Sequence, residues 1–139
     1  MSKLREEFRT LDFIFRHESE IFHAVEKIKN AEVSIFNDSH LKDPTAADAL
    51  KNLILVDSVT IFGKIIKSPQ KWLKIISATY SAAKIKNFDV YEIAKRRYHE
   101  KEYFLTTCIK KFIGKSTYYR FLETFLKIAE HESKKFFAE

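Results

Sequence analysis

The sequence has few residues that break or cross-link a chain: its 139 residues include two glycines, two prolines and one cysteine. So few turn-forming residues favour long helices. Cys108 has no second cysteine for an internal disulfide, so we expect a reducing compartment and a small buried hydrophobe at this position. No strand pattern, low-complexity tract or glycine-rich phosphate loop is visible.

Long apolar runs are also missing. Residues 1–10 lack the apolar core of a signal peptide, and the most apolar run, residues 53–66, is interrupted by Asp57, Gly63 and Lys64. A helix that spans a bilayer needs about 20 predominantly apolar residues. We therefore expect a cytoplasmic protein that does not interact with a membrane.

Apolar residues are nevertheless abundant, at 45% of the chain with 13 phenylalanines, which predicts one globular domain of residues 1–139. They recur at helical spacing in five segments. The expected helices cover residues 2–36, 45–67, 69–86, 89–113 and 118–137. The pattern predicts an all-α fold.

The expected architecture is a four-helix bundle with one extra helix. Hairpin 1 covers about residues 2–67, hairpin 2 covers about residues 89–137, and a crossover helix over about residues 69–86 joins them. Residues 45–67 form an apolar stripe on two opposite sides of the expected helix. The crossover helix could cover the second side; the alternative is a partner subunit, which would make the protein a homodimer.

Three carboxylates fall within these apolar stripes, in three different helices: Glu18, Asp57 and Glu132. A buried carboxylate without a partner is costly, so each requires a cation, a hydrogen-bond donor or a proton. Lys101 also falls inside an apolar stripe, that of residues 89–113. What neutralises the three carboxylates is therefore central to function.

The segment IAEHESKKF, residues 128–136, resembles the Glu-x-x-His motif segment of the ferritin-like superfamily, in its rubrerythrin branch. Glu132 matches the glutamate of that motif, and Lys135 stands at the histidine position. In the expected second helix, Asp57 stands at the corresponding glutamate position and Thr60 at the histidine position.

The first and fourth long helices extend the resemblance. Glu18 matches the single glutamate of the first helix. Tyr98 stands at the remaining glutamate position, with Glu102 about one turn further on. The resemblance implies two helical hairpins joined by a crossover, with a metal site between the helices.

Two interpretations follow. In the first, one or two iron or manganese ions are bound, and oxidase- or peroxidase-type oxidoreductase chemistry is implied. The ligands would be Glu18, Asp57 and Glu132, completed by Glu102, Tyr98 or His131. In the second, no cofactor is bound, and Lys101 and Lys135 reach inward to pair with the carboxylates.

Charge gives an alternative function. The net charge is +6, but residues 1–60 carry −3 and residues 61–139 carry +9. A basic surface attracts nucleic acid or an acidic protein, and tyrosines can stack on bases. The alternative is therefore a non-enzymatic basic helical bundle that binds nucleic acid or a protein partner through residues 61–120. Its candidate residues are Lys95, Arg96, Arg97, Lys110 and Lys111, with Tyr91, Tyr98, Tyr103, Tyr118 and Tyr119 nearby.

Overall fold

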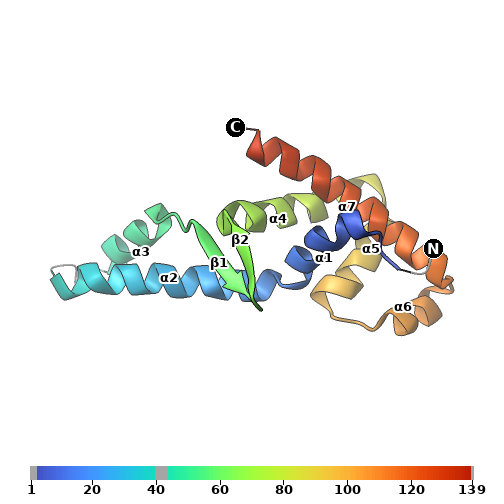
Figure 1. The fold of residues 1–139 in the computed structure, drawn as a ribbon, viewed down its shortest axis with the longest axis horizontal. Coiled ribbons are helices and arrows are strands. Elements are labelled where there is room, and N and C mark those ends of the chain that lie inside the picture. Colours follow the sequence, from blue (N-terminus) through green and yellow to red (C-terminus); the bar gives the residue numbers. More distant parts are fainter. Residues whose placement is uncertain (1–2, 40–43, 139) are drawn as a thin grey trace. The chain divides into compact units, whose positions relative to one another are not determined.

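The computed structural model describes residues 3–39 and 44–138. It is predominantly helical, which confirms the all-α expectation at a coarse level, with seven α-helices and one small sheet in these ranges (Figure 1). The chain forms two compact units. Unit 1 comprises Met1–Glu18 and Lys74–Glu139, and unit 2 comprises Ser19–Leu73. In the described ranges, no helix has the length and apolar character that crossing a bilayer requires.

The helix expected over residues 2–36 is interrupted, so that prediction is wrong. A short 3-10 helix, Glu6–Phe8, leads into α1, Arg9–Arg16. His17 then leaves the helical region, with φ −112° and ψ 28°, and α2, Glu18–Ser39, begins at the next residue. Neither glycine nor proline marks this point in the sequence, which is why the apolar pattern appeared continuous.

The expected crossover segment is a helix: α4, Pro69–Lys86, starts and ends where the sequence predicts. The helix expected over residues 89–113 is divided into three parts, so this prediction is wrong in its continuity. The parts are α5, Phe88–Ala94, a π-helix, Lys95–His99, and α6, Phe104–Lys111. Asn87 caps α5 by accepting a hydrogen bond from the backbone N–H of Val90 at 3.3 Å.

Unit 1 is completed by α7, Lys115–Phe137, which packs against α1, α5 and α6. Its core is an aromatic cluster of Phe15, Tyr80, Tyr98 and Phe125. The ring of Phe15 meets that of Phe125 edge-on, with centroids 5.3 Å apart, and Tyr80 lies 5.1 Å from Phe125. The edge-to-face pair of Phe15 and Phe125 adds to the stabilisation that burial of the rings provides. Of the phenylalanines in unit 1, Phe15 and Phe125 thus lie in the core, whereas Phe112 is exposed.

Unit 2 contains a β-hairpin where the sequence predicts a helix. The expected helix over residues 45–67 is wrong: α3 covers only Pro44–Leu53, and the antiparallel strands β1, Ser58–Ile61, and β2, Lys64–Lys67, follow (Figure 1). Phe62 and Gly63 form the turn with φ 47° and φ 80°. Two left-handed residues in a two-residue loop match the twist of a β-hairpin.

The side chain of Gln70 fixes the chain that leads into the hairpin. Its Oε1 accepts a hydrogen bond from the N–H of Val56 at 2.8 Å, and its Nε2 donates to the carbonyl of Ile54 at 2.9 Å. Val59 and Ile66, which pair across the hairpin, are both buried. Residues 45–67 therefore do not form a helix with two apolar sides. The homodimer was expected as a cover for the second of those sides, so this reason for it no longer applies.

Candidate functional site

The three carboxylates of the expected apolar stripes have three different surroundings. Asp57 is exposed in unit 2, just before β1, so the prediction that it points into a core is wrong. Glu132 is buried in unit 1, as predicted. Lys135 Nζ donates to Glu132 Oε1 at 3.5 Å while remaining 59% exposed, so it pairs with this carboxylate from the surface and does not reach inward.

Glu18 is half-buried at the start of α2 and lines a cavity of about 330 Å³ in unit 1. Burial raises the pKa of Glu18, and the charges of His99 and Lys101 lower it in part. Lys101 is exposed, so its predicted inward direction is wrong. The residues that line this cavity, the Glu18 pocket, are Glu18, Ser77, Tyr80, Ser81, Tyr91, Lys95 and His99.

The expected metal ligands do not converge in the described parts of the chain. Within residues 3–39 and 44–138, no three His, Cys, Asp or Glu residues are placed to hold a metal ion. His131 is exposed. Lys95 and His99 are the groups that accompany Glu18 in its pocket, and a lysine ammonium there repels a divalent cation. The iron or manganese site stays a prediction of the resemblance.

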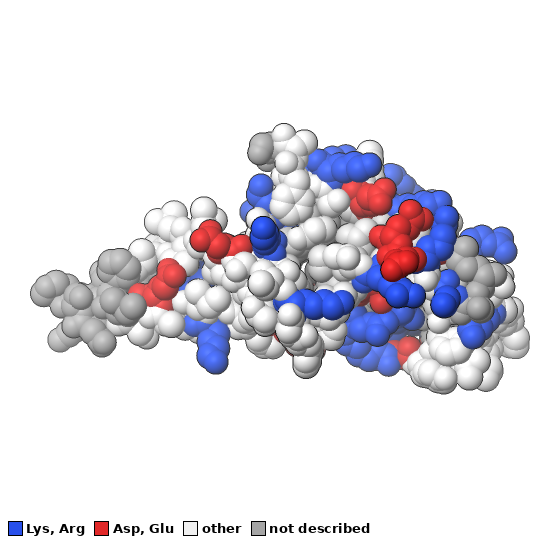
Figure 2. Space-filling model, viewed as in Figure 1, with Lys and Arg blue, Asp and Glu red and all other residues white. Residues whose placement is uncertain are grey.

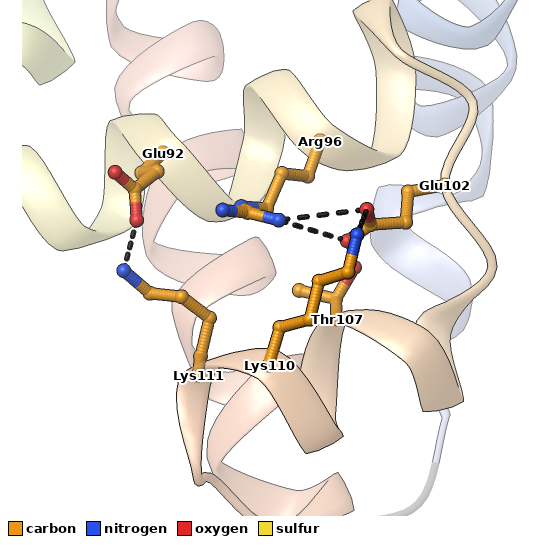
Figure 3. A network of polar contacts seen from close by, with 6 residues as sticks. All are labelled: Glu92, Arg96, Glu102, Thr107, Lys110 and Lys111. Carbon is orange, nitrogen blue, oxygen red and sulfur yellow. Dashed lines mark hydrogen bonds and ion pairs between the residues drawn. The ribbon is translucent and has the colours of Figure 1, made fainter.

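Glu102, another expected metal ligand, is the centre of a polar network instead (Figure 3). It accepts hydrogen bonds from Thr107 Oγ1 at 2.6 Å, Arg96 Nη1 at 3.1 Å and Lys110 Nζ at 3.1 Å. These donors, led by Thr107, lower the pKa of Glu102 to about 2. The network connects the π-helix to α6, so it holds the connecting segment of residues 100–103 in place.

Most of the basic residues expected to bind nucleic acid are engaged within unit 1. Lys111 pairs with Glu92 beside the Glu102 network (Figure 3). Lys95 lines the Glu18 pocket. Arg96 and Lys110 share Glu102, so they are less available to a polyanion than the sequence suggests.

Asp12, on α1, is the second acidic centre of unit 1. It accepts hydrogen bonds from Tyr98 Oη at 2.5 Å, Arg97 Nε at 3.2 Å and Arg16 Nη2 at 3.0 Å. Burial lowers the pKa of Arg97, but Asp12, Tyr98 and Tyr118 together raise it by more, so the pKa is raised overall. Burial, together with Asp12, raises the pKa of Tyr98. Tyr98, expected near a metal, is thus a fully buried structural donor.

A second cavity, of about 450 Å³, is lined by Glu102 and by the two arginines that pair with Asp12, and it combines cations with aromatic rings. We name it the basic–aromatic cleft. Tyr103 is 62% exposed, and its ring meets that of Phe104 edge-on at 4.9 Å. The ring centroid of Tyr119 lies 6.1 Å from that of Phe104. The lining residues are Arg16, Arg97, Lys101, Glu102, Tyr103, Phe104 and Tyr119.

Lys101 reaches the cleft through a strained backbone. Its φ of 56° lies in the left-handed region, which residues with a β-carbon avoid at a cost of about 1–2 kcal/mol. Its Nζ donates to the backbone carbonyl of Arg16. Left-handed non-glycine residues are found disproportionately at binding sites. The left-handed conformation of Lys101 therefore makes residues 100–103 a candidate part of a binding site, beyond their role as the connection between the π-helix and α6.

The ion pairs leave the cleft positive. Five cations converge on the carboxylates of Asp12 and Glu102 and on the cleft beside them. They are Arg16, Arg96, Arg97, Lys101 and Lys110. On the face drawn in Figure 2, Lys and Arg side chains border acidic ones in the region of unit 1.

Sequence reasoning missed Arg16 and the ion pair between Arg5 and Glu123. Asp12 and Arg16 stand four residues apart on one helix, a spacing that indicates a pair. Glu123 is buried, and Arg5 Nη2 lies 2.9 Å from its Oε1. Burial raises the pKa of Glu123, but the hydrogen bonds and charge of Arg5 lower it overall. No local signal connects residues so far apart in the sequence.

We compared the chain with models of protein families, with curated proteins and with solved structures, and none of them matches it.

Proposed function

We propose that this protein binds single-stranded nucleic acid in the basic–aromatic cleft of unit 1. The observation that carries the proposal is the lining of one cavity by three cations, Arg16, Arg97 and Lys101, and three aromatic rings. Proteins that bind single strands combine positive charge that follows the phosphates with aromatic side chains on which bases stack. The cleft supplies both within one unit.

The size and charge of the cleft support this choice. Its volume of about 450 Å³ lies within the range of about 300–1,000 Å³ that is usual for ligand sites. The surrounding network holds five cations against the two carboxylates of Asp12 and Glu102, so phosphate is attracted. Exposed rings favour unpaired bases over a duplex, because a paired base hides both of its faces in the stack.

The residues of the cleft have separable roles. Arg97 is held by Asp12 and Tyr118, so it stabilises the fold as well as the charge of the cleft. Arg16 is half exposed, and Lys101 is exposed, so these two would contact phosphate. Tyr103, the most exposed ring of the cleft, would stack on a base.

The test measures fluorescence anisotropy of a labelled single-stranded oligonucleotide over a series of salt concentrations. We expect the logarithm of affinity to fall linearly with the logarithm of salt. Lys101→Gln should reduce that slope by about 0.7, the value for one phosphate contact on a single strand. Lys86→Gln, which removes an exposed lysine at the end of α4, is the matched control. It should leave the affinity for the oligonucleotide unchanged.

Tyr103 provides the second arm. Tyr103→Ala should cost about 1–3 kcal/mol of binding free energy, as the loss of one stacked base does, whereas Tyr103→Phe should retain most of it. Binding that is absent, insensitive to salt, or equally weakened by Lys86→Gln and Lys101→Gln would contradict the proposal.

A further inference from the structure

Phe112, at the C-terminus of α6, adopts a backbone conformation that is unfavourable for phenylalanine. Phe112 has φ 55° and ψ 43°, in the left-handed region. Its N–H donates to the carbonyl of Ile109 at 3.3 Å, and the N–H of Ile113 donates to Cys108 at 3.0 Å. This pattern is the usual left-handed helix cap, where glycine or asparagine normally stands because neither suffers much from a β-carbon contact. The fold alone would select a different residue.

The ring of Phe112 gains nothing from burial within this chain, because it is 96% exposed. Ile109 and Leu105, three and seven residues earlier, are 74% and 48% exposed. At 3.6 residues per turn the three side chains share one face of the helix and its end. The opposite side of α6 is anchored by the buried Thr107, and the buried Cys108 lies at one edge of the stripe. We name Leu105, Ile109 and Phe112 the α6 apolar stripe.

Lysines flank this stripe. Lys110 and Lys111 lie between Ile109 and Phe112, and Lys115 begins α7 just beyond. Lys110 pairs with Glu102 and Lys111 with Glu92, while Arg96 also contacts Glu102 (Figure 3). Three cations thus contact two carboxylates, and with Lys115 beside them the surroundings of the stripe stay positive.

We propose that the α6 apolar stripe docks unit 1 onto the surface of an anionic lipid bilayer, with the ring of Phe112 inserted at the headgroup boundary. Apolar side chains beside lysines are the signature of segments that lie at a membrane interface. This mode is peripheral, so it needs no spanning helix.

Two other occupants fit less well. A stable protein interface needs about 800 Å² from each partner, and three side chains along one short helix supply only a small part of this area. A second copy of the chain, paired through the same stripe, would bring the lysines of both copies together, and like charges repel. A lipid surface needs only a few inserted side chains and supplies the opposite charge.

The test uses sedimentation with vesicles of phosphatidylcholine alone or with phosphatidylglycerol added. We expect binding to the anionic vesicles only, weakened by salt. Phe112→Gly is the decisive variant, because it removes the ring while supplying the residue that the left-handed cap prefers. It should lower the partition coefficient at least tenfold without lowering the thermal midpoint. Leu55→Ser is the matched control: it removes an apolar side chain of unit 2 that is 84% exposed, and should not change binding.

Three results would overturn this proposal. Wild-type protein that does not sediment with anionic vesicles would do so, as would Phe112→Gly protein that sediments like the wild type. A concentration-dependent dimer that Phe112→Gly dissociates, without vesicle binding by the wild type, would assign the stripe to a second copy instead.

Discussion

The hydroxyl of Tyr98 donates a 2.5 Å hydrogen bond to Oδ1 of Asp12, a residue 86 positions earlier in the chain. The same carboxylate receives Arg97 and Arg16, so α1 and the π-helix meet at one point. This contact brings Arg16, at the end of α1, beside Arg97 of the π-helix and Lys101 just after it. The basic–aromatic cleft therefore depends on Asp12.

Substitution of Asp12 should weaken both the fold and the cleft. Asp12→Asn removes the charge that balances Arg97 and weakens the bond to Tyr98, so we expect a loss of about 1–3 kcal/mol in the free energy of unfolding. Urea denaturation followed by circular dichroism measures it. Tyr98→Phe, which removes one neutral donor, should cost less, about 1 kcal/mol. A larger loss in Tyr98→Phe than in Asp12→Asn would contradict the role of Asp12 as the common acceptor.

The Glu102 network should make stability depend on pH in the acidic range. The pKa of Glu102 is about 2 in the folded chain, against 4.5 for an ordinary glutamate. A depressed pKa means that the carboxylate contributes stability above about pH 4.5 and loses it as the pH falls towards about 2. The free energy of unfolding, measured by denaturation at pH 5 and at pH 3, should change less between these two pH values in Glu102→Gln than in the wild type. Equal differences would mean that Thr107, Arg96 and Lys110 do not hold the ionised form.

The turn of the hairpin can be strengthened or weakened by single substitutions. Phe62 occupies a left-handed position that asparagine tolerates better, and its ring is 75% exposed. Phe62→Asn should therefore raise the stability of unit 2 by about 0.5–1 kcal/mol. Gly63→Ala should lower it by about 1 kcal/mol through backbone strain, because no atom lies within 4 Å of the added β-carbon. Amide hydrogen exchange of β1 and β2 reports both changes, and Gly63→Ala protein with unchanged exchange would contradict the left-handed turn.

Elemental analysis of protein loaded with Fe(II) or Mn(II) tests the ferritin-like resemblance directly. Glu132 pairs with Lys135, and Glu18 stands beside Lys95 and His99. We therefore expect that Glu132→Ala does not change the metal content. If the wild type binds one or two equivalents of metal, and both Glu18→Ala and Glu132→Ala bind less, this expectation is contradicted and the metal site is supported.

Local sequence signals predicted those parts of the fold that neighbouring residues decide. The bounds of α4 follow from Ser68-Pro69 and the helical spacing that follows. The apolar stripe of α7 correctly placed Glu132 in the core, because helical periodicity is the same wherever the helix packs. Isolated apolar runs are ambiguous: the spacing of residues 58–67 predicts a helix, although their β-branched residues and Gly63 also suit the hairpin that they form.

The sequence by itself determined a helical protein with a basic second half, because composition and periodicity are local properties of the chain. Only the tertiary structure decided how those charges are used. Asp12 and Glu102 hold three of the six arginines in internal networks, and Lys101, itself in the left-handed region, donates to the backbone carbonyl of Arg16. The contacts of Arg97 with Asp12 and of Lys101 with Arg16 each join residues 85 positions apart, and a linear pattern carries no signal for them.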